Sequence, residues 1–373
     1  MPEVPVQDKV LVSSAFNSDT HGQLGCTYCH AGDPTGTTRA VAHVGLVNDP
    51  SATPSQACSC HTTQVQASPQ MLHTTLRGIA MSLVDRSGGG DTLSTSMQTV
   101  FGNHCARCHA SCGNCHVSVP AAAGGGLLMS HGFQRKPSTT LVCTACHGSR
   151  VGDEFRGQNA GIAPDVHYSK GLACVACHSG DEMHAASPTA RSRYDVPERA
   201  RCTNCHPDDT AFKDATAQHT MHRNTDGTMK LTCQVCHAAT YKNCSSCHVS
   251  KDADGLAVYT VNQSPDYASV MSFKIGKNPK QGTERPQKWA TVRHAPADPA
   301  NYDYYGAGLS STFDARPTWE YATPHTIQRK TPQNQSCTAC HAHRELFLGP
   351  ADLATYEVGA NQAVVVGDSE IPQ

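Results

Sequence analysis

The chain has 373 residues, of which 38% are hydrophobic and 16% are charged, and its formal net charge is −2. This balance does not indicate nucleic-acid binding, and no uncharged apolar run of about 18 residues is present that could cross a membrane as a helix. Only 2 Trp and 8 Phe accompany 20 Cys, 30 Gly and 22 Pro. The chain therefore has few large apolar side chains with which to fill a core.

Nine copies of the sequence Cys-x-x-Cys-His recur along the chain, from Cys26 to His30 at one end to Cys337 to His341 at the other. This spacing is the attachment signature of c-type haem: each thiol adds to one haem vinyl group, and the following His ligates the iron. The eighteen cysteines of these motifs are Cys26, Cys29, Cys105, Cys108, Cys112, Cys115, Cys143, Cys146, Cys174, Cys177, Cys202, Cys205, Cys233, Cys236, Cys244, Cys247, Cys337 and Cys340.

The remaining two cysteines form a shortened motif, Cys58-Ser59-Cys60-His61. With one residue between the thiols, two thioether bonds and a His ligand require a backbone geometry that differs from that of the other nine motifs. A single thioether through Cys60, with Ala57 in the place of the first cysteine, is the simpler solution. We expect a tenth haem c here, because a free exposed thiol is a liability in an exported protein. The alternative is a degenerate motif without haem, which leaves nine.

Other uses of paired cysteines explain the pattern less well. Zinc ribbons use two such pairs for each metal, but zinc coordination requires no His directly after every second Cys. A disulfide framework is compatible with the even number of cysteines, yet it predicts no fixed residue after each pair. Thioredoxin-like redox motifs occur once in a domain. Covalent haem is the interpretation that accounts for both the spacing and the following His.

The attachment motifs predict the fold class, which is mostly coil with short α-helices, few strands and stacked haems as the core. The first cysteines of successive motifs lie about thirty residues apart over much of the chain, as from Cys143 to Cys174 and from Cys202 to Cys233. Residues 1–250 form a region with nine attachment sites, 251–336 a wrapping segment without motifs that supplies distal His ligands, and 337–373 the last site and a tail. We expect these regions to form one continuous haem-chain domain.

The 88 residues between His248 and Cys337 contain no attachment motif but concentrate aromatic residues, including both Trp. A binding pocket is one interpretation. The simpler one is a segment that wraps around haem faces and delivers His294 and His325 as ligands. The tail contains the apolar run from Ala363 to Val366, which indicates either an edge strand that pairs with another chain or a frayed terminus.

The number of histidines matches the number of irons. Of 22 His, ten follow a motif cysteine and are expected to be the proximal ligands. Ten haems with two His ligands each need ten further histidines, and twelve are present. The proximal ligands are His30, His61, His109, His116, His147, His178, His206, His237, His248 and His341.

The distal ligands are expected among the other twelve histidines, although the sequence does not pair them with individual irons. His104 directly precedes a motif, and His219 lies one helical turn from His222, so these two are the less favoured members. Met71, Met183 and Met221 could supply a His/Met haem, but the supply of His already suffices. The favoured distal ligands are His21, His43, His73, His131, His167, His184, His222, His294, His325 and His343.

The location expected for the chain is outside the cytoplasm, either periplasmic or extracellular. Haem is attached to c-type cytochromes after export, whereas the start Met1-Pro2-Glu3-Val4 has neither the basic nor the apolar part of a signal peptide. We therefore expect the sequence to be a mature chain, or one from which the signal was removed. Two propionates on each of ten haems would bring the formal charge to about −22 if all were ionised.

With these motifs in view, the chain resembles the large multihaem c-type cytochromes of periplasmic and extracellular respiratory electron transfer. The resemblance covers the motifs from Cys26 to His341. It implies electron transfer without substrate chemistry, with other redox proteins or extracellular electron acceptors as partners. The filament-forming members, in which a neighbouring subunit supplies an axial His, match the size of the chain, and they imply self-polymerisation with His21 ligating a neighbouring haem. The alternatives are a multihaem reductase with one open iron and a monomeric periplasmic electron shuttle.

Overall fold

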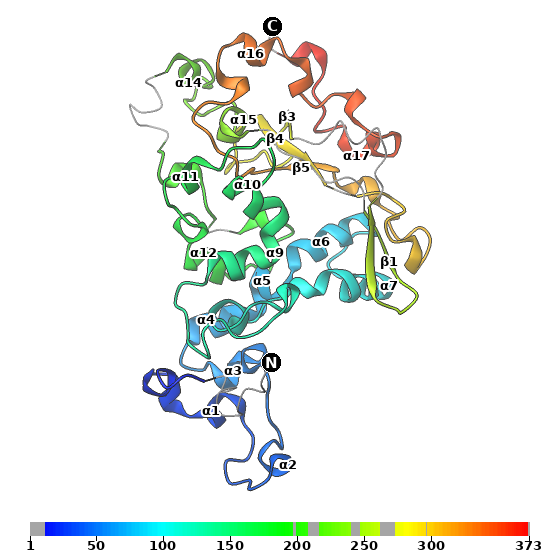
Figure 1. The fold of residues 1–373 in the computed structure, drawn as a ribbon. Helices are drawn as coiled ribbons and strands as arrows, with labels where there is room; N and C mark the ends of the chain where they lie inside the picture. The colour runs from blue at the N-terminus through cyan, green and yellow to red at the C-terminus, as the bar shows by residue number, and fades with distance from the viewer. Residues whose placement is uncertain are drawn as a thin grey trace. The chain divides into compact units, whose positions relative to one another are not determined.

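The computed structural model describes residues 12–196, 199–207, 216–239, 247–261, 273–295 and 297–371. The chain is 43% helical and 10% strand, and the helices are short (Figure 1). The longest described helix, α6, has ten residues, Arg77–Arg86. Among these residues no helix is long and apolar enough to span a membrane. The expectation of a coil-rich chain with short helices and few strands is confirmed.

The chain divides into two compact units that are interleaved along the sequence. The first unit comprises residues 1–78, 106–148 and 174–199, and the second comprises residues 79–105, 149–173 and 200–373. This division does not follow the three predicted regions, because each unit recruits segments from distant parts of the chain. Five complete attachment motifs lie in the first unit and four in the second, while the motif that starts at Cys105 crosses the division.

The first unit is built from helices of four to six residues joined by coil. Helices this short are unstable on their own, so contacts outside the helix must hold them. Two helices coincide with complete attachment motifs, which places both thiols and the His on one turn and a half of helix. The helices are α1 Cys26–His30, α2 Arg39–Ala42, α3 Pro54–Ala57, α4 Thr62–Ala67, α5 Leu72–Thr75, α8 Cys112–His116, α9 Thr144–His147 and α12 Gly180–His184.

The second unit combines short helices with two small antiparallel sheets. Strands β1 Cys247–Lys251 and β2 Ala257–Val261 form a hairpin, and β3 Lys274–Lys277, β4 Trp289–His294 and β5 Trp319–Tyr321 form a three-stranded sheet in the order β3-β4-β5. Besides α6, its helices are α7 Thr95–Val100, α10 Asp153–Arg156, α11 Val166–Ser169, α14 Ala217–Met221, α15 Cys233–His237, α16 Thr338–His341 and α17 Val358–Asn361.

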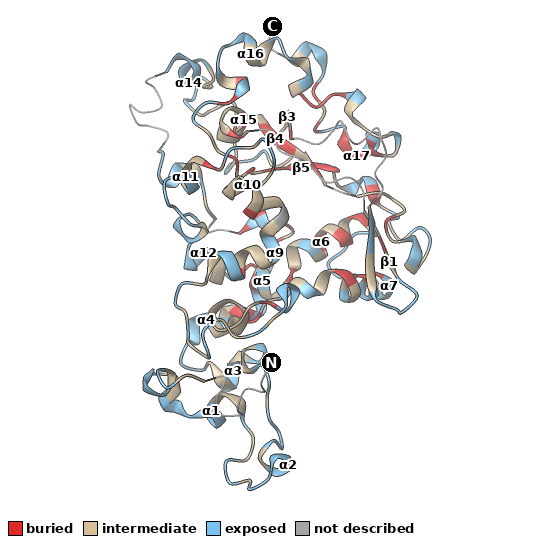
Figure 2. Ribbon diagram, viewed as in Figure 1, coloured by how far each residue is buried: buried red, intermediate tan, exposed pale blue. Residues whose placement is uncertain are grey.

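A conventional apolar core surrounds the three-stranded sheet (Figure 2). Val292, Trp319, Leu348 and Val364 are completely buried against one another. The expected wrapping segment therefore contributes core strands, and the C-terminal tail belongs to the same core. The tail neither frays nor presents an edge, because Val364 accepts a backbone hydrogen bond from Lys277 and Val366 donates one to Leu348. Both expectations for the tail were wrong.

Packing in the first unit is different. The three clusters of buried apolar side chains all lie in the second unit. In the described part of the first unit, the buried apolar residues are scattered and form no cluster of this kind. They are Met71, Leu76, Val142, Ala190, Tyr194 and Val196. Burial of apolar side chains alone does not account for a stable first unit. The composition predicts this, because the chain has few large apolar side chains with which to fill a core.

Arg86 ties helix α6 to the segment that precedes β5. Its buried guanidinium donates hydrogen bonds to the carbonyl oxygens of Phe313, Arg316 and Pro317 at 2.8 to 3.0 Å, and it lies 3.9 Å from the carboxylate of Glu320. Several acceptors depend on one cation, so its removal leaves partly buried carbonyls without a donor.

We predict that Arg86→Met lowers the opening free energy of the β4 amides by about 3 kcal/mol, because carbonyl acceptors lose their donor while the methylene volume is retained. Hydrogen exchange followed by mass spectrometry measures this quantity. Arg39→Met is the matched control, since Arg39 is exposed on α2 and its replacement should leave β4 unchanged. A loss below about 1 kcal/mol in the Arg86 variant would contradict the role assigned to this side chain.

Candidate haem-ligand sites

Seven of the ten motif histidines face one histidine that belongs to no motif. The ring centroids of each pair lie 5.6 to 6.3 Å apart, and the two members are far apart in sequence or belong to different elements. The pairs are His61 with His21 (6.1 Å), His30 with His131 (5.6 Å), His147 with His73 (6.3 Å), His116 with His184 (6.2 Å), His206 with His167 (6.3 Å), His237 with His219 (6.1 Å) and His341 with His222 (6.0 Å).

This separation is the one that an iron between two imidazoles requires. Two metal–nitrogen bonds of about 2 Å, plus about 1.2 Å from each nitrogen to its ring centre, give a centroid separation of roughly 6.4 Å for collinear bonds. In the His30 and His131 pair the two Nε2 atoms face each other at 3.4 Å, so they would have to separate by roughly 0.6 Å to admit a metal. Imidazoles that pack for other reasons have no cause to adopt one common spacing at seven places. The residues therefore fit bis-His haem.

Hydrogen bonds hold the rings so that Nε2 is the atom left for a metal. A ligating His usually donates its other ring N–H to a carbonyl or carboxylate, which fixes the tautomer. Nine candidate ligands have an oxygen acceptor 2.6 to 3.2 Å from Nδ1. Backbone carbonyls serve His30, His116, His222, His237 and His248, and carboxylates serve His21 (Asp19), His167 (Asp165), His178 (Glu182) and His343 (Glu345).

Burial favours the neutral imidazole, which is the form that binds a metal. Desolvation lowers the pKa of His73, His147, His184 and His237, each of which belongs to one of the seven pairs. The pKa of His178 moves the other way, because its hydrogen bond to the Glu182 carboxylate stabilises the protonated ring.

Apolar side chains are exposed beside the motifs. Of seventeen exposed large hydrophobic residues in the described ranges, twelve lie within three residues of a motif cysteine or a histidine, although such positions make up less than half of the chain. An apolar macrocycle held at these positions would cover them. The twelve are Leu24, Tyr28, Val41, Val44, Leu46, Met129, Phe133, Leu141, Tyr168, Leu172, Val175 and Met221.

The cysteines of the described ranges are all free of disulfides, and Cys244 lies outside those ranges. Burial, together with the neighbouring thiols of Cys340 and Cys233, raises the pKa of the Cys236 thiol to about 12. Within the same ranges no group of three or more His, Cys, Asp or Glu side chains surrounds a metal position. A bis-His haem forms no such group, because the porphyrin supplies the other four ligands of its iron.

The pairs bear on two of the expectations for individual histidines. His219 and His222 lie on one turn of α14, and each has its own partner, His237 and His341. His219 therefore has the same geometric support as His222, and its role as a ligand stays a prediction. His21 stacks near His61 of its own chain, which offers it a ligand position there. Its expected role in a neighbouring subunit stays a prediction.

Three motif histidines, His109, His178 and His248, lie outside the seven pairs. The same holds for five other candidates, which occupy varied surroundings. His43 and His343 are exposed, and the backbone N–H of His325 donates to Glu154 at 2.8 Å.

In the last two of these five candidates, His104 and His294, the Nε2 atom contacts a neighbouring side chain. His104 has this atom 2.7 Å from the Tyr305 hydroxyl. His294 is buried with the same atom hydrogen-bonded to Glu357, and its ring lies 5.4 Å from that of Trp319. The distal roles expected for His43, His294, His325 and His343 remain predictions.

The shortened motif keeps the backbone hydrogen bond of the regular ones. In regular motifs the His N–H donates to the carbonyl of the first cysteine, as from His341 to Cys337 at 2.9 Å. In the shortened motif His61 donates to Cys58, also at 2.9 Å. The turn of the shortened motif is one residue tighter, so Cys58 has the backbone position that the first cysteine has in a regular motif. The sequence had suggested Ala57 for that position. Cys60 remains directly before the ligand.

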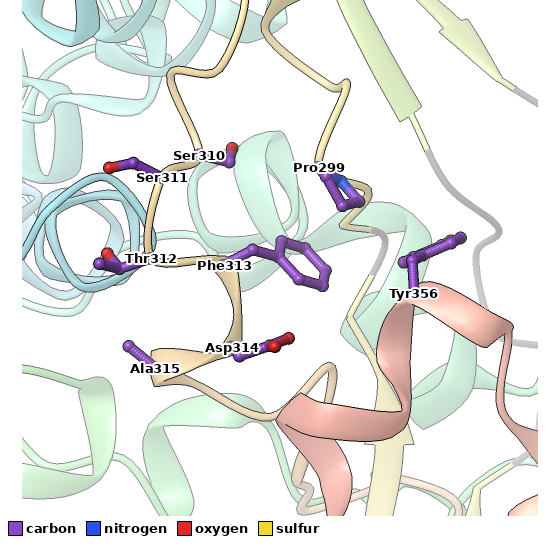
Figure 3. Close-up of a pocket in the computed structure, with 8 residues that line it drawn as sticks. All are labelled: Pro299, Ser310, Ser311, Thr312, Phe313, Asp314, Ala315 and Tyr356. Atoms are coloured by element: carbon purple, nitrogen blue, oxygen red, sulfur yellow. The ribbon is translucent and has the colours of Figure 1, made fainter.

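The described residues also include an open pocket of about 560 Å³ in the second unit (Figure 3). It is lined by Pro299, Tyr356 and the segment 310–315, in which Phe313 and Asp314 point into the space. None of these residues is a candidate haem ligand. Its polar groups are the Asp314 carboxylate and the hydroxyls of Ser310, Ser311, Thr312 and Tyr356.

Comparison of the chain with protein-family models, with curated proteins and with solved structures finds no match. The assignment of the site therefore depends on the motifs and on the geometry of the paired histidines.

We predict that Cys60→Ala lowers the number of covalently bound haems by one, whereas Cys58→Ala keeps all of them. Cys60 and His61 are adjacent, so thioether and ligand share one turn, and loss of Cys60 separates them. Mass spectrometry of the intact denatured chains counts the haems directly. Equal haem content in the Cys60 variant and the parent protein would show that this motif does not attach haem through Cys60.

Proposed function

We propose that the protein is an electron conduit, in which c-type haems held by paired histidines pass single electrons from site to site. The observation that carries the proposal is the common spacing of the seven His pairs. When bound, haem supplies a one-electron change between ferric and ferrous iron. The chain supplies the thiols that attach it and the two imidazoles that close both axial positions.

Closed axial positions favour electron transfer over substrate chemistry. An enzyme of this class needs an iron with one free position, and two His ligands leave none. His pairs also keep reduction potentials low relative to His/Met haems, which suits delivery to redox proteins or extracellular acceptors. The multihaem reductase is the less supported alternative, because all ten motifs end in His and seven already face a second one.

Contacts between attachment motifs support transfer between neighbouring sites. The hydroxyls of Tyr28 and Ser59, each in the middle of an attachment motif, lie 3.4 Å apart. Helix α14 supplies ligands to two motifs at once through His219 and His222. One contact in the first unit and one shared helix in the second thus bring attachment motifs near each other, which supports the passage of electrons between them.

The proposal does not depend on polymerisation. His21 was the residue expected to ligate a neighbouring haem in a filament, and it faces His61 within the same chain. A conduit within one chain and a subunit of a longer assembly both fit this arrangement. The location remains the one expected from the motifs, outside the cytoplasm.

We predict that the oxidised protein shows low-spin ferric signals in electron paramagnetic resonance, and that His131→Ala converts one haem to a high-spin form that binds carbon monoxide when reduced. His131 is the partner of His30, so its loss opens one axial position. Gln134→Ala is the control: in the same loop, Gln134 meets the His116 ring through its backbone carbonyl, which the substitution retains. A fully low-spin His131 variant with unchanged haem content would refute this ligand assignment.

A further inference from the structure

One paired histidine of the second unit is hydrogen-bonded to a buried carboxylate. Asp165 directly precedes helix α11, and its Oδ1 accepts from the backbone N–H and from the ring Nδ1 of His167, at 2.8 and 2.9 Å. The His167 ring faces that of His206, the last residue of the motif that starts at Cys202, called here the Cys202 site. The side chain of Asp165 is 3% exposed. The carboxylate therefore touches a candidate axial ligand and is shielded from water.

The surrounding chain holds this carboxylate in place. Its second oxygen, Oδ2, accepts the backbone N–H of Ile327 at 2.8 Å, and Val166 donates its own N–H to the carbonyl oxygen of Ile327, also at 2.8 Å. The backbone N–H of Asp165 donates to the carbonyl oxygen of Phe155 at 3.0 Å. Both carboxylate oxygens thus accept from N–H groups, which is the arrangement that suits an ionised carboxylate. Asp165 presents a fixed negative charge to the ring of His167.

The next residue of the same segment serves a different site with a neutral group. The backbone carbonyl oxygen of Gln328 lies 3.2 Å from Nδ1 of His237, which ends the motif that starts at Cys233, called here the Cys233 site. The two sites adjoin, because the side-chain nitrogen of Gln234, inside the Cys233 motif, lies 3.9 Å from the sulfur of Cys202. Neighbouring sites therefore differ in the charge of the group behind one ligand.

Burial distinguishes Asp165 from the other carboxylate that serves one of the seven pairs in the described part of the chain. That carboxylate is Asp19, whose side chain is 48% exposed and lies 3.1 Å from Nδ1 of His21. Water and salt screen an exposed charge, whereas a buried charge acts on its neighbours through a lower dielectric. We therefore expect the effect of Asp165 on its site to be the larger of the two.

We propose that Asp165 lowers the reduction potential of the haem at the Cys202 site and so shifts electrons toward the adjoining Cys233 site. The inference rests on the proposed function. Asp165 acts through His167 and is a positioning residue, not an axial ligand. Each transfer moves one electron, which oxidises the Cys202 site and reduces the Cys233 site, and no bond breaks.

Two physical effects support the proposal, and they act in the same direction. Ferric haem carries one more positive charge than ferrous haem, so a buried anion nearby stabilises the ferric form. A carboxylate that accepts the Nδ1 proton of an imidazole also makes that ring a more basic ligand, which again favours the ferric form. Removal of the charge should therefore make the Cys202 site easier to reduce.

Spectroelectrochemical titration of the full haem-loaded chain tests this inference with Asp165→Asn, which removes the charge and keeps the size of the side chain. We expect the ferrous-to-ferric ratio of one haem at a fixed potential to rise about tenfold, which is about 59 mV for one electron. The difference between the parent and variant titrations is then one peak with a height of about half a haem. Asp165→Ser should shift the same haem in the same direction, because Ser also caps the start of a helix but carries no charge.

Three controls separate the charge from its surroundings. Gln328→Ala removes the 2.6 Å hydrogen bond from the Gln328 side chain to the carbonyl oxygen of Pro164, which ties the same two segments, and it alters no charge. Asp19→Asn removes the exposed carboxylate. Each should change the ratio of any haem by less than about threefold. In a Cys202→Ala/Cys205→Ala background, which has one haem fewer, Asp165→Asn should leave the titration unchanged.

Several results would overturn the role of Asp165. They are titrations of both Asp165 variants that superimpose on that of the parent, an equal shift in Gln328→Ala, and a shift that persists without the Cys202 haem. Loss of one low-spin haem in both neutral variants would also overturn it, because Asp165 would then be needed to hold the ligand. A parent protein without covalent haem, or without reversible reduction, would instead contradict the conduit itself.

Discussion

The proposed function depends on one recurring interaction, in which a motif imidazole lies opposite an imidazole from outside the motifs. Such a pair can join segments far apart in sequence, as with His30 and His131, which are 101 residues apart. In the proposed conduit, the motif cysteines would anchor one side of a haem and the second imidazole its other face. Each ligated iron would then crosslink distant parts of a chain that is mostly coil.

This dependence is unequal between the two units. The second unit has a sheet with a conventional core around Trp319 and Leu348, and the C-terminal tail closes it. The first unit holds five complete motifs, and its described residues contain only scattered buried apolar side chains. A haem buries more apolar surface than any side chain, so on the proposed function covalent attachment would supply the first unit with the interior that its sequence lacks.

The motifs name part of the candidate site. Each expected proximal ligand is the His that follows a motif cysteine, so all ten can be named without a structure, and their ligation of iron stays a prediction. The distal ligands could be counted but not paired, because pairing depends on how coil segments cross, and coil has no periodic pattern to interpret. His219 shows this limit: its position one turn from His222 suggested redundancy, whereas α14 places each of the two beside a different motif histidine.

The strands of the second unit were missed for a similar reason. Residues 251–336 have no attachment motif and few long apolar runs, so wrapping coil was the natural expectation. Their strands are short, and burial on β4 comes from tertiary contacts with Leu348 and Val364, which local sequence does not reveal. The same contacts determine the place of the tail. Its apolar run predicted a strand or a frayed end, and the actual partner is the core of its own chain.

Near-infrared magnetic circular dichroism of the fully oxidised protein tests the central claim most directly, because the charge-transfer band of low-spin ferric haem reports the chemical identity of both axial ligands. The account predicts that the band of bis-imidazole ligation accounts for at least seven haems in each chain. Bands of His/Met or high-spin haem in place of these seven would contradict it.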